Sequence, residues 1–370
     1  MMKRFRATAG CVLVVGLVVS GCATRMGSSG IRPDTENYNE AIARSADEQL
    51  LLNLVRLRYR DRPLFLELQS VVSQRSLRGD VSGGMKIGVG GGSGNEGVLG
   101  VSGTYEEKPT VTYTPLKGED FARRILTPLT PETIILLSNS GWSIERLFLI
   151  CVSRLNGVEN APTASGPTPV EAPDFEEFRE LVVTLREMQR EGLLTLQVFR
   201  TPGQEMPQIE VIIDVPTEAE AKLNDRLERL RSRLNLAEGE HRLRLTSALR
   251  PTQENEIALN PRSLMGVFYY LSQAVVPPLE HEEKGLVTVT RDENGDRFDW
   301  ARVTGQVFAV KSQESKPEDA FVAVRHRGYW FYIADNDLKS KTTFVLLHFL
   351  LSLQSGGDAG MAPVLTLPAG

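Results

Sequence analysis

The densest group of side chains able to hold a ligand lies between residues 325 and 332. This run reads Arg-His-Arg-Gly-Tyr-Trp-Phe-Tyr. Aromatic faces and guanidinium groups stack on sugars and on cations, so one hypothesis is a ligand or glycan platform. The alternative is an ordinary strand buried on both faces, since this composition has high β-propensity. The candidate ligand-binding residues are Arg325, Arg327, Tyr329, Trp330 and Tyr332.

Patterns typical of enzyme active sites are missing from the sequence. Its four histidines are isolated and none belongs to an HExxH or Cys/His cluster, which disfavours a zinc site. The glycines of residues 90–97 lack the Lys-Ser/Thr of a P-loop, and no Gly-x-Ser-x-Gly elbow occurs. Residues 292–296 indicate an Asn-Gly turn, because their glycine comes too early for a calcium loop. We therefore expect that the protein is not an enzyme and that it binds no metal and no other cofactor.

The first 22 residues have the order of an export signal. Lys3, Arg4 and Arg6 form a basic start, an apolar run covers residues 11–19, and residues 19–22 read Val-Ser-Gly-Cys. The apolar run is too short to cross a bilayer as a permanent helix. We expect residues 1–21 to be removed as a signal peptide.

This ending resembles the lipobox of bacterial lipoproteins, which has an aliphatic residue, two small residues and an invariant cysteine. The resemblance implies that Cys22 is the mature first residue and carries acyl chains, palmitate among them, on its sulfur and amine. Ala23 stands where an Asp retains enteric lipoproteins at the inner membrane, so an outer-membrane anchor facing the periplasm is implied. Residues 50–59 and 328–333 are also similar to an uncharacterised Gram-negative lipoprotein family, which implies no activity.

Charge and cysteine content limit the kinds of partner that the protein can have. Loss of residues 1–21 removes three cationic side chains and no acidic one, which takes the formal net charge from −5 to −8. Binding to nucleic acid is therefore disfavoured, and attachment to the membrane must come from the lipid on Cys22. Cys151 is then the remaining thiol, and its apolar neighbours predict a buried small residue and no nucleophile.

Residues 79–105 predict a glycine-rich hairpin with eleven glycines. Its odd-numbered positions are mainly apolar and its even-numbered positions small or polar, except for Val98, while residues 90–97 have turn composition. The two arms of eight or nine residues approach the roughly nine to eleven that a tilted membrane strand needs. The candidate membrane-inserting residues are Val81, Met85, Ile87, Val89, Leu99, Val101 and Tyr105.

Two hypotheses follow for this hairpin. In one, copies from several subunits close into an oligomeric pore or secretion channel, because an isolated hairpin cannot satisfy its edges in lipid. In the other, it is a mobile loop or an edge hairpin, because glycine weakens strands. The expected partners are accordingly the membrane and other envelope proteins or further copies of the chain. We therefore expect a structural or assembly component of an envelope complex. The alternative is a periplasmic ligand- or glycan-binding lipoprotein, or an uncharacterised enzyme, that uses residues 325–332.

Periodicity predicts an α+β fold with two mixed helix and antiparallel-sheet domains. A helix over residues 37–59 carries Arg56 and Arg58 on its polar face, and residues 286–303 predict a hairpin. Residues 64–72 and 194–199 predict strands, and residues 335–337 are expected to cap a final helix. Four prolines place a linker at residues 158–173. The expected parts are a signal (1–21), a flexible tether (22–35), an N-terminal domain (36–157) with its hairpin (79–105), the linker, and a C-terminal domain (174–370).

Overall fold

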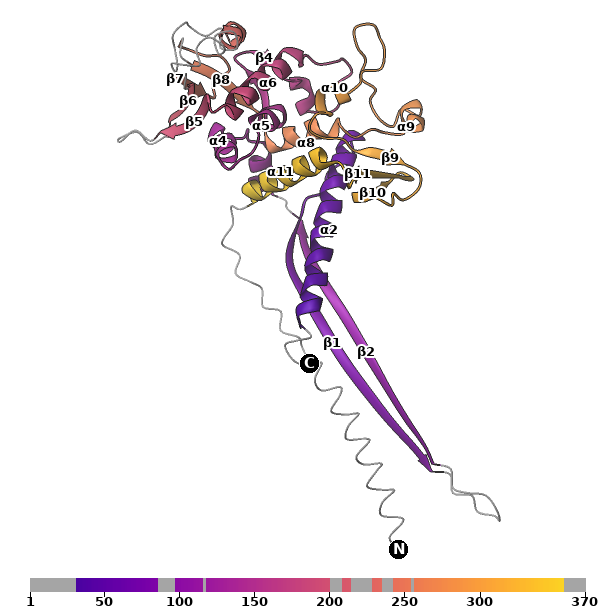
Figure 1. Cartoon of the computed structure of the whole chain (residues 1–370). Helices are drawn as coiled ribbons and strands as arrows, with labels where there is room; N and C mark the ends of the chain where they lie inside the picture. The colour runs from indigo at the N-terminus through magenta and orange to yellow at the C-terminus, as the bar shows by residue number, and fades with distance from the viewer. Residues whose placement is uncertain are drawn as a thin grey trace, which may run out of the picture. The chain divides into compact units, whose positions relative to one another are not determined.

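The computed structural model describes residues 31–85, 97–115, 118–199, 208–213, 228–234, 242–253 and 256–355. The chain divides into two compact units (Figure 1). Unit 1 comprises Met1–Pro63 and Glu119–Gly370, and unit 2 comprises Leu64–Gly118. Helices occur together with antiparallel and mixed sheets, which confirms the predicted α+β class.

The larger sheet of unit 1 has six strands in the order β4-β3-β8-β7-β6-β5. Neighbouring strands are antiparallel, except that β7 and β8 run parallel. β5 has the bounds predicted from its alternating apolar residues. The strands are β3 (Val152–Leu155), β4 (Val158–Glu159), β5 (Leu194–Phe199), β6 (Gln208–Ile213), β7 (Arg242–Thr246) and β8 (Glu256–Pro261).

The expected domain boundary at residues 158–173 is not where the chain divides. β3, before this segment, pairs with β8, far beyond it, so the two expected domains share one sheet. The proline-rich segment also contains the short 3₁₀ helix η1 (Pro162–Ser165), and its Val170 carbonyl accepts a hydrogen bond from the Arg291 amide at 2.8 Å. Its polar groups are thus bonded to the rest of unit 1, and the prolines shape a docked loop.

A smaller antiparallel sheet has the order β10-β11-β9. Its strands are β9 (Lys311–Gln313), β10 (Ala320–His326) and β11 (Tyr329–Ala334). The hairpin expected over residues 286–303 is reduced to its turn, where Gly295 has φ +83°, and one isolated antiparallel bridge between Arg291 and Arg297. Asp299 accepts a hydrogen bond from the Ala301 amide at 2.9 Å and starts the short helix α10 (Ala301–Thr304) in place of a second strand.

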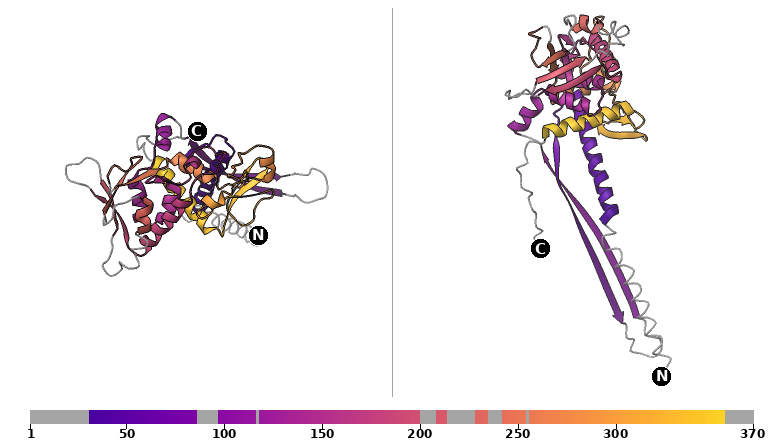
Figure 2. Two further views of the ribbon diagram at one scale, coloured as in Figure 1. Left: turned by 90° about the horizontal axis from the view of Figure 1, so that it is seen from above. Right: turned by 60° about the vertical axis from the view of Figure 1, so that its left-hand side comes forward.

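Helices join the two sheets. In Figures 1 and 2 the six-stranded sheet and the three-stranded sheet lie on opposite sides of α8, and α11 (yellow) contacts α8 and α3. The Ser263 hydroxyl caps α8 by accepting from the Gly266 amide at 3.0 Å. The helices are α2 (Ile31–Arg58), α3 (Glu119–Leu126), α4 (Pro131–Asn139), α5 (Ile144–Cys151), α6 (Glu176–Arg190), α8 (Leu264–Ser272), α9 (Leu279–Glu283), α10 and α11 (Leu338–Ser355).

The first of these helices differs from expectation at both ends. α2 covers Ile31–Arg58, so the described part of the expected tether of residues 22–35 is already helical. At its other end Arg58 is only 4 % exposed, so it does not lie on a solvated face. Leu54 and Leu51, one and two turns earlier, are fully buried, and α2 contacts both α8 and β10.

Unit 2 is one long hairpin. β1 (Leu66–Met85) and β2 (Gly97–Pro115) pair from Leu66 and Pro115 to Met85 and Gly97, with one register shift between Leu68 and Ser70. Each strand has about twenty residues, which corresponds to roughly 65 Å of extended chain. The predicted hairpin of residues 79–105 is therefore the outer part of a longer ribbon, and the strand expected separately at residues 64–72 is its beginning.

Candidate functional site

The residues predicted to bind a ligand lie in the β10–β11 hairpin. Arg327 and Gly328 form its turn, both with positive φ, and Arg325 pairs with Trp330 across the strands. The alternative prediction for this segment, a strand buried on both faces, is wrong. Phe331 and its neighbour at 333 are buried, whereas Tyr329, Trp330 and Tyr332 are only half-buried and Arg325 is exposed.

Two of the predicted residues are held by carboxylates from other elements. The Arg327 guanidinium binds both carboxylate oxygens of Asp61, at 2.9 and 3.1 Å. The Tyr329 hydroxyl donates to Glu280, on α9, at 2.9 Å. These contacts fasten the hairpin turn to the end of α2 and to α9, and they occupy the polar groups that a sugar or cation would need.

Tyr59 lies at the centre of this cluster. Its hydroxyl is 2.6 Å from Nδ1 of His281, its ring meets His326 edge-on at 5.1 Å, and Arg327 lies over it at 5.3 Å. Burial raises the pKa of Tyr59 above its usual range. Burial also lowers the pKa of both His281 and His326. All three rings are therefore neutral at neutral pH, and the hydrogen bond between the Tyr59 hydroxyl and Nδ1 of His281 joins two uncharged groups.

This arrangement predicts a loss of stability in mild acid. Because the pKa values of His281 and His326 are lower in the folded than in the unfolded state, the unfolded chain binds more protons as pH falls through about 6.5. The free energy of unfolding, from denaturant titrations between about pH 7.5 and pH 5, should decline with pH. His281→Asn keeps an acceptor near Nδ1 and should flatten the decline. Parallel curves for the two proteins would contradict it.

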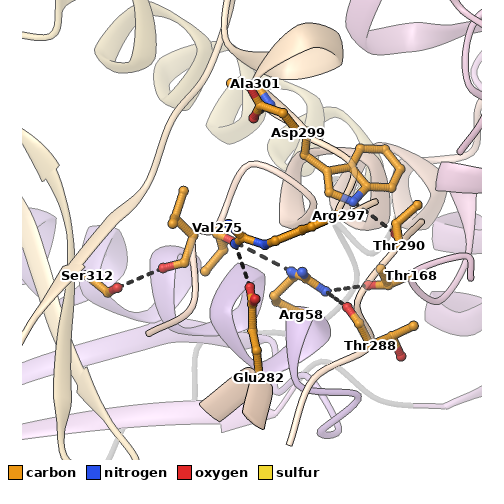
Figure 3. Close-up of polar contacts among 12 residues, drawn as sticks. Arg58, Thr168, Val275, Glu282, Thr288, Thr290, Arg297, Asp299, Ala301 and Ser312 are labelled. Carbon is orange, nitrogen blue, oxygen red and sulfur yellow. Dashed lines mark hydrogen bonds and ion pairs between the residues drawn. The ribbon is translucent and has the colours of Figure 1, made fainter. Parts of the chain in front are cut away.

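A second polar region surrounds a cavity of about 180 Å³ in unit 1. It lies between the ends of α2 and α8, the helix α9, and the segment leading into α10, as Figure 3 shows for its polar residues. Its wall includes Phe298 and Trp300, and the Trp300 ring donates to the Thr290 hydroxyl at 3.1 Å. The cavity therefore combines an aromatic wall with charged groups.

Arg58 is the buried charge of this cavity. Its Nε donates to the Val275 carbonyl at 3.4 Å, and its Nη1 donates to the Thr168 hydroxyl at 3.1 Å and to the Thr288 carbonyl at 3.0 Å. All three acceptors are uncharged. Burial lowers the pKa of Arg58 to about 10, an effect that nearby Glu282 opposes. The guanidinium stays charged at neutral pH.

The other charges at the cavity are already engaged. Arg297 and Glu282 form an ion pair at 2.6 Å, and Asp299 caps α10. The Thr290 hydroxyl donates to the Pro169 carbonyl, and the Thr304 hydroxyl donates to the Trp300 carbonyl. The described lining thus offers no activated nucleophile, and its chemistry suits binding.

Sequence reasoning missed Arg58 and Gln273, which both line this cavity. A signal for Arg58 existed, since it follows Leu51 and Leu54 at helical spacing and so falls on the apolar stripe of α2. No sequence signal marked Gln273, because it follows the apolar residues of α8 and belongs to no repeating pattern of polar residues. The prediction for Cys151 is confirmed: it is fully buried, and burial raises its thiol pKa to about 12.

The predicted membrane-inserting residues lie on one face of the β1–β2 ribbon where the structure describes them. Val81 pairs with Val101, Met85 with Gly97, and Tyr105 with Leu77. Paired residues have the same parity beyond the register shift, so odd-numbered positions of both strands share a face. Ile87, Val89 and the lipidation candidate Cys22 lie outside the described residues.

Other features of the described residues give few further indications of function. Within the described ranges, no helix is long and apolar enough to span a membrane, and no three His, Cys, Asp or Glu side chains gather as metal ligands. Comparison with protein-family models, curated proteins and solved structures finds no match. The chain is defined here as an α+β protein with a long hairpin inserted between α2 and α3.

Proposed function

We propose that this protein is an outer-membrane lipoprotein, anchored through Cys22 and facing the periplasm, whose copies assemble into a pore. Each copy contributes its β1–β2 hairpin. One observation carries this proposal: beyond its one register shift the hairpin keeps a single antiparallel register, and its outer half separates apolar from polar positions.

The residue types along the ribbon support membrane insertion of its outer half. Residues 77–85 pair with residues 97–105, nine on each strand, which matches the roughly nine to eleven that cross a bilayer when tilted. Every odd-numbered position in these segments is apolar, glycine or tyrosine: Leu77, Gly79, Val81, Gly83, Met85, Gly97, Leu99, Val101, Gly103 and Tyr105. The charged residues of these segments, Arg78 and Asp80, are both even-numbered.

The inner half of the ribbon has the composition of an aqueous segment. Arg75 pairs with Glu107 on the odd face, directly before Leu77 and Tyr105. The change from charged to apolar positions therefore falls at Tyr105, and tyrosine is typical of the boundary between lipid and water. The ribbon thus has separate segments for water and for lipid.

Pore formation requires several copies. A two-stranded ribbon leaves the outer backbone groups of both strands without partners, and each such group costs several kcal/mol in lipid. Pairing each hairpin with those of neighbouring subunits removes both edges. An acyl anchor on Cys22 would hold every subunit at the same membrane surface, which favours this assembly over free collision.

Ligand or glycan binding by residues 325–332 is the less supported function. Arg327 and Tyr329 are committed to Asp61 and Glu280, and Trp330 is already covered by Lys316, whose ammonium lies 5.6 Å from its ring. These contacts fasten the β10–β11 hairpin to the rest of unit 1 and leave few polar groups for a ligand.

Deletion of residues 82–104 tests the proposal. Detergent-extracted full-length protein should form a large ring, visible by electron microscopy, and should release dye from vesicles. The deletion should abolish both properties while the unfolding of unit 1, followed by tryptophan fluorescence, stays unchanged, because the hairpin is a separate compact unit. A ring that persists after the deletion, or none in the intact protein, would exclude the pore.

A further inference from the structure

The lining of the cavity beside Arg58 contains one buried acceptor without a partner, on Gln273, and one guanidinium nitrogen without an acceptor, on Arg58, among the described residues. Arg58 is 4 % exposed, and its hydrogen bonds use only Nε and Nη1, which leaves Nη2 without an acceptor among the described residues. Gln273 is 2 % exposed, and its Nε2 donates to the Tyr269 carbonyl at 3.1 Å. Its Oε1 is buried and has no hydrogen bond within the described part of the chain. A donor and an acceptor are thus both unsatisfied in the lining of one cavity.

Arg262 shows what a purely structural buried arginine looks like in the same unit. It is 2 % exposed and, like Arg58, touches no carboxylate, but all three of its nitrogens have acceptors. Its guanidinium also lies over the Tyr270 ring at 4.1 Å. Arg58 differs because its Nη2 has no acceptor among the described residues. Buried polar groups are almost always bonded, so the unpartnered Oε1 of Gln273 in the same lining needs another explanation.

We propose that this cavity binds a small carboxylate that also carries a hydrogen-bond donor, such as a hydroxy acid or an amino acid. The carboxylate accepts from Nη2 of Arg58, and the ligand's hydroxyl or ammonium donates to Oε1 of Gln273. The site lies within unit 1 and does not depend on the pore.

Charge and size limit the ligand to this class. Arg297 is paired with Glu282, so Arg58 is the cation in the described lining without a counter-ion in contact, and it complements a single negative charge. Glu282 and Asp299 nearby disfavour a dianion such as phosphate. A volume of about 180 Å³ is little more than the roughly 150 Å³ of a cavity that accepts benzene. Phe298 and Trp300 provide the surface for the ligand's carbon atoms.

Three probes that differ in one substituent test the proposal: propionate, lactate and L-alanine carry hydrogen, hydroxyl and ammonium at the same carbon. Binding is followed by the fluorescence of Trp300 in a Trp142→Phe, Trp330→Phe background and by the shift in melting temperature. Lactate or alanine should bind at least about tenfold more tightly than propionate, which corresponds to about 1.4 kcal/mol.

Substitutions at Gln273 and Arg58 test the two proposed ligand contacts one at a time. Gln273→Met should remove the preference over propionate, and Arg58→Lys should weaken all three probes. Gln313→Met, on β9 outside the cavity, should change nothing. If Arg58→Lys fails to fold, Gln273→Met still decides the question. Absence of saturable binding by every probe, or equal preference in the wild type and Gln273→Met, would overturn the proposal, as would tighter binding of inorganic phosphate.

Discussion

Replacing Arg262 by methionine should lower the free energy of unfolding of unit 1 by about 4 kcal/mol. Arg262 lies between β8 and α8, and its guanidinium is buried beneath the carbonyl end of α5. Methionine has a similar length but no donors, so several buried carbonyls would lose their partners at once. The acceptors are the Ser165 hydroxyl at 3.0 Å, the Leu149 and Ile150 carbonyls at 3.2 Å each, and the Val152 and Asn160 carbonyls.

Denaturant unfolding followed by tryptophan fluorescence measures this effect in the full mature chain. The three tryptophans, Trp142, Trp300 and Trp330, all belong to unit 1, so the signal reports that unit alone. Arg325→Met is the matched control, because Arg325 is exposed, and it should change stability by less than about 0.5 kcal/mol. Equal effects of the two substitutions would show that Arg262 does not hold α5, β8 and α8 together.

Val101→Arg should abolish pore formation, whereas Ser102→Arg should preserve it. Val101 and its partner Val81 belong to the odd-numbered face that we assign to lipid, and Ser102 and its partner Asp80 belong to the other face. An arginine at the bilayer midplane costs about 2–4 kcal/mol on the lipid face, and the cost recurs in every subunit. On the opposite face the same charge would meet water and alter only ion selectivity.

Dye release from vesicles and ring formation in detergent measure both variants. The two substitutions add the same side chain at adjacent positions of one strand, so differences in folding or β-propensity cancel. If Val101→Arg and Ser102→Arg were equally active, or equally inactive, the assignment of the two faces would be wrong.

Local patterns in the sequence were sufficient for many elements. The strand at residues 194–199 was predicted with the bounds of β5, and the helix after residue 337 corresponds to α11. These segments have a regular spacing of apolar residues that suits one secondary structure only. The same alternation correctly predicted one face of the glycine-rich hairpin, because strand periodicity depends on the backbone and not on distant partners.

Pairing between distant segments could not be predicted in this way. β7 and β8 are parallel neighbours, and β3 joins β8 across about a hundred residues of chain. The proline-rich residues 158–173 read as a linker because composition does not reveal what a loop bonds to. The strand expected at residues 297–303 starts with alternating burial but pairs, within the described residues, only through the isolated bridge between Arg297 and Arg291, and the chain then turns into α10.

The candidate functional residues likewise fall into those that local sequence patterns identify and those that only the tertiary structure identifies. The sequence by itself determined the export signal pattern ending at Cys22, the apolar face of the hairpin, and the cluster of aromatic and cationic residues near 325–332. Only the tertiary structure decided that Asp61 and Glu280 occupy that cluster, and that Arg58 and Gln273 share a cavity. The reason is physical: periodicity depends on neighbours along the chain, whereas burial and hydrogen bonding of a charged group depend on residues that folding brings from elsewhere.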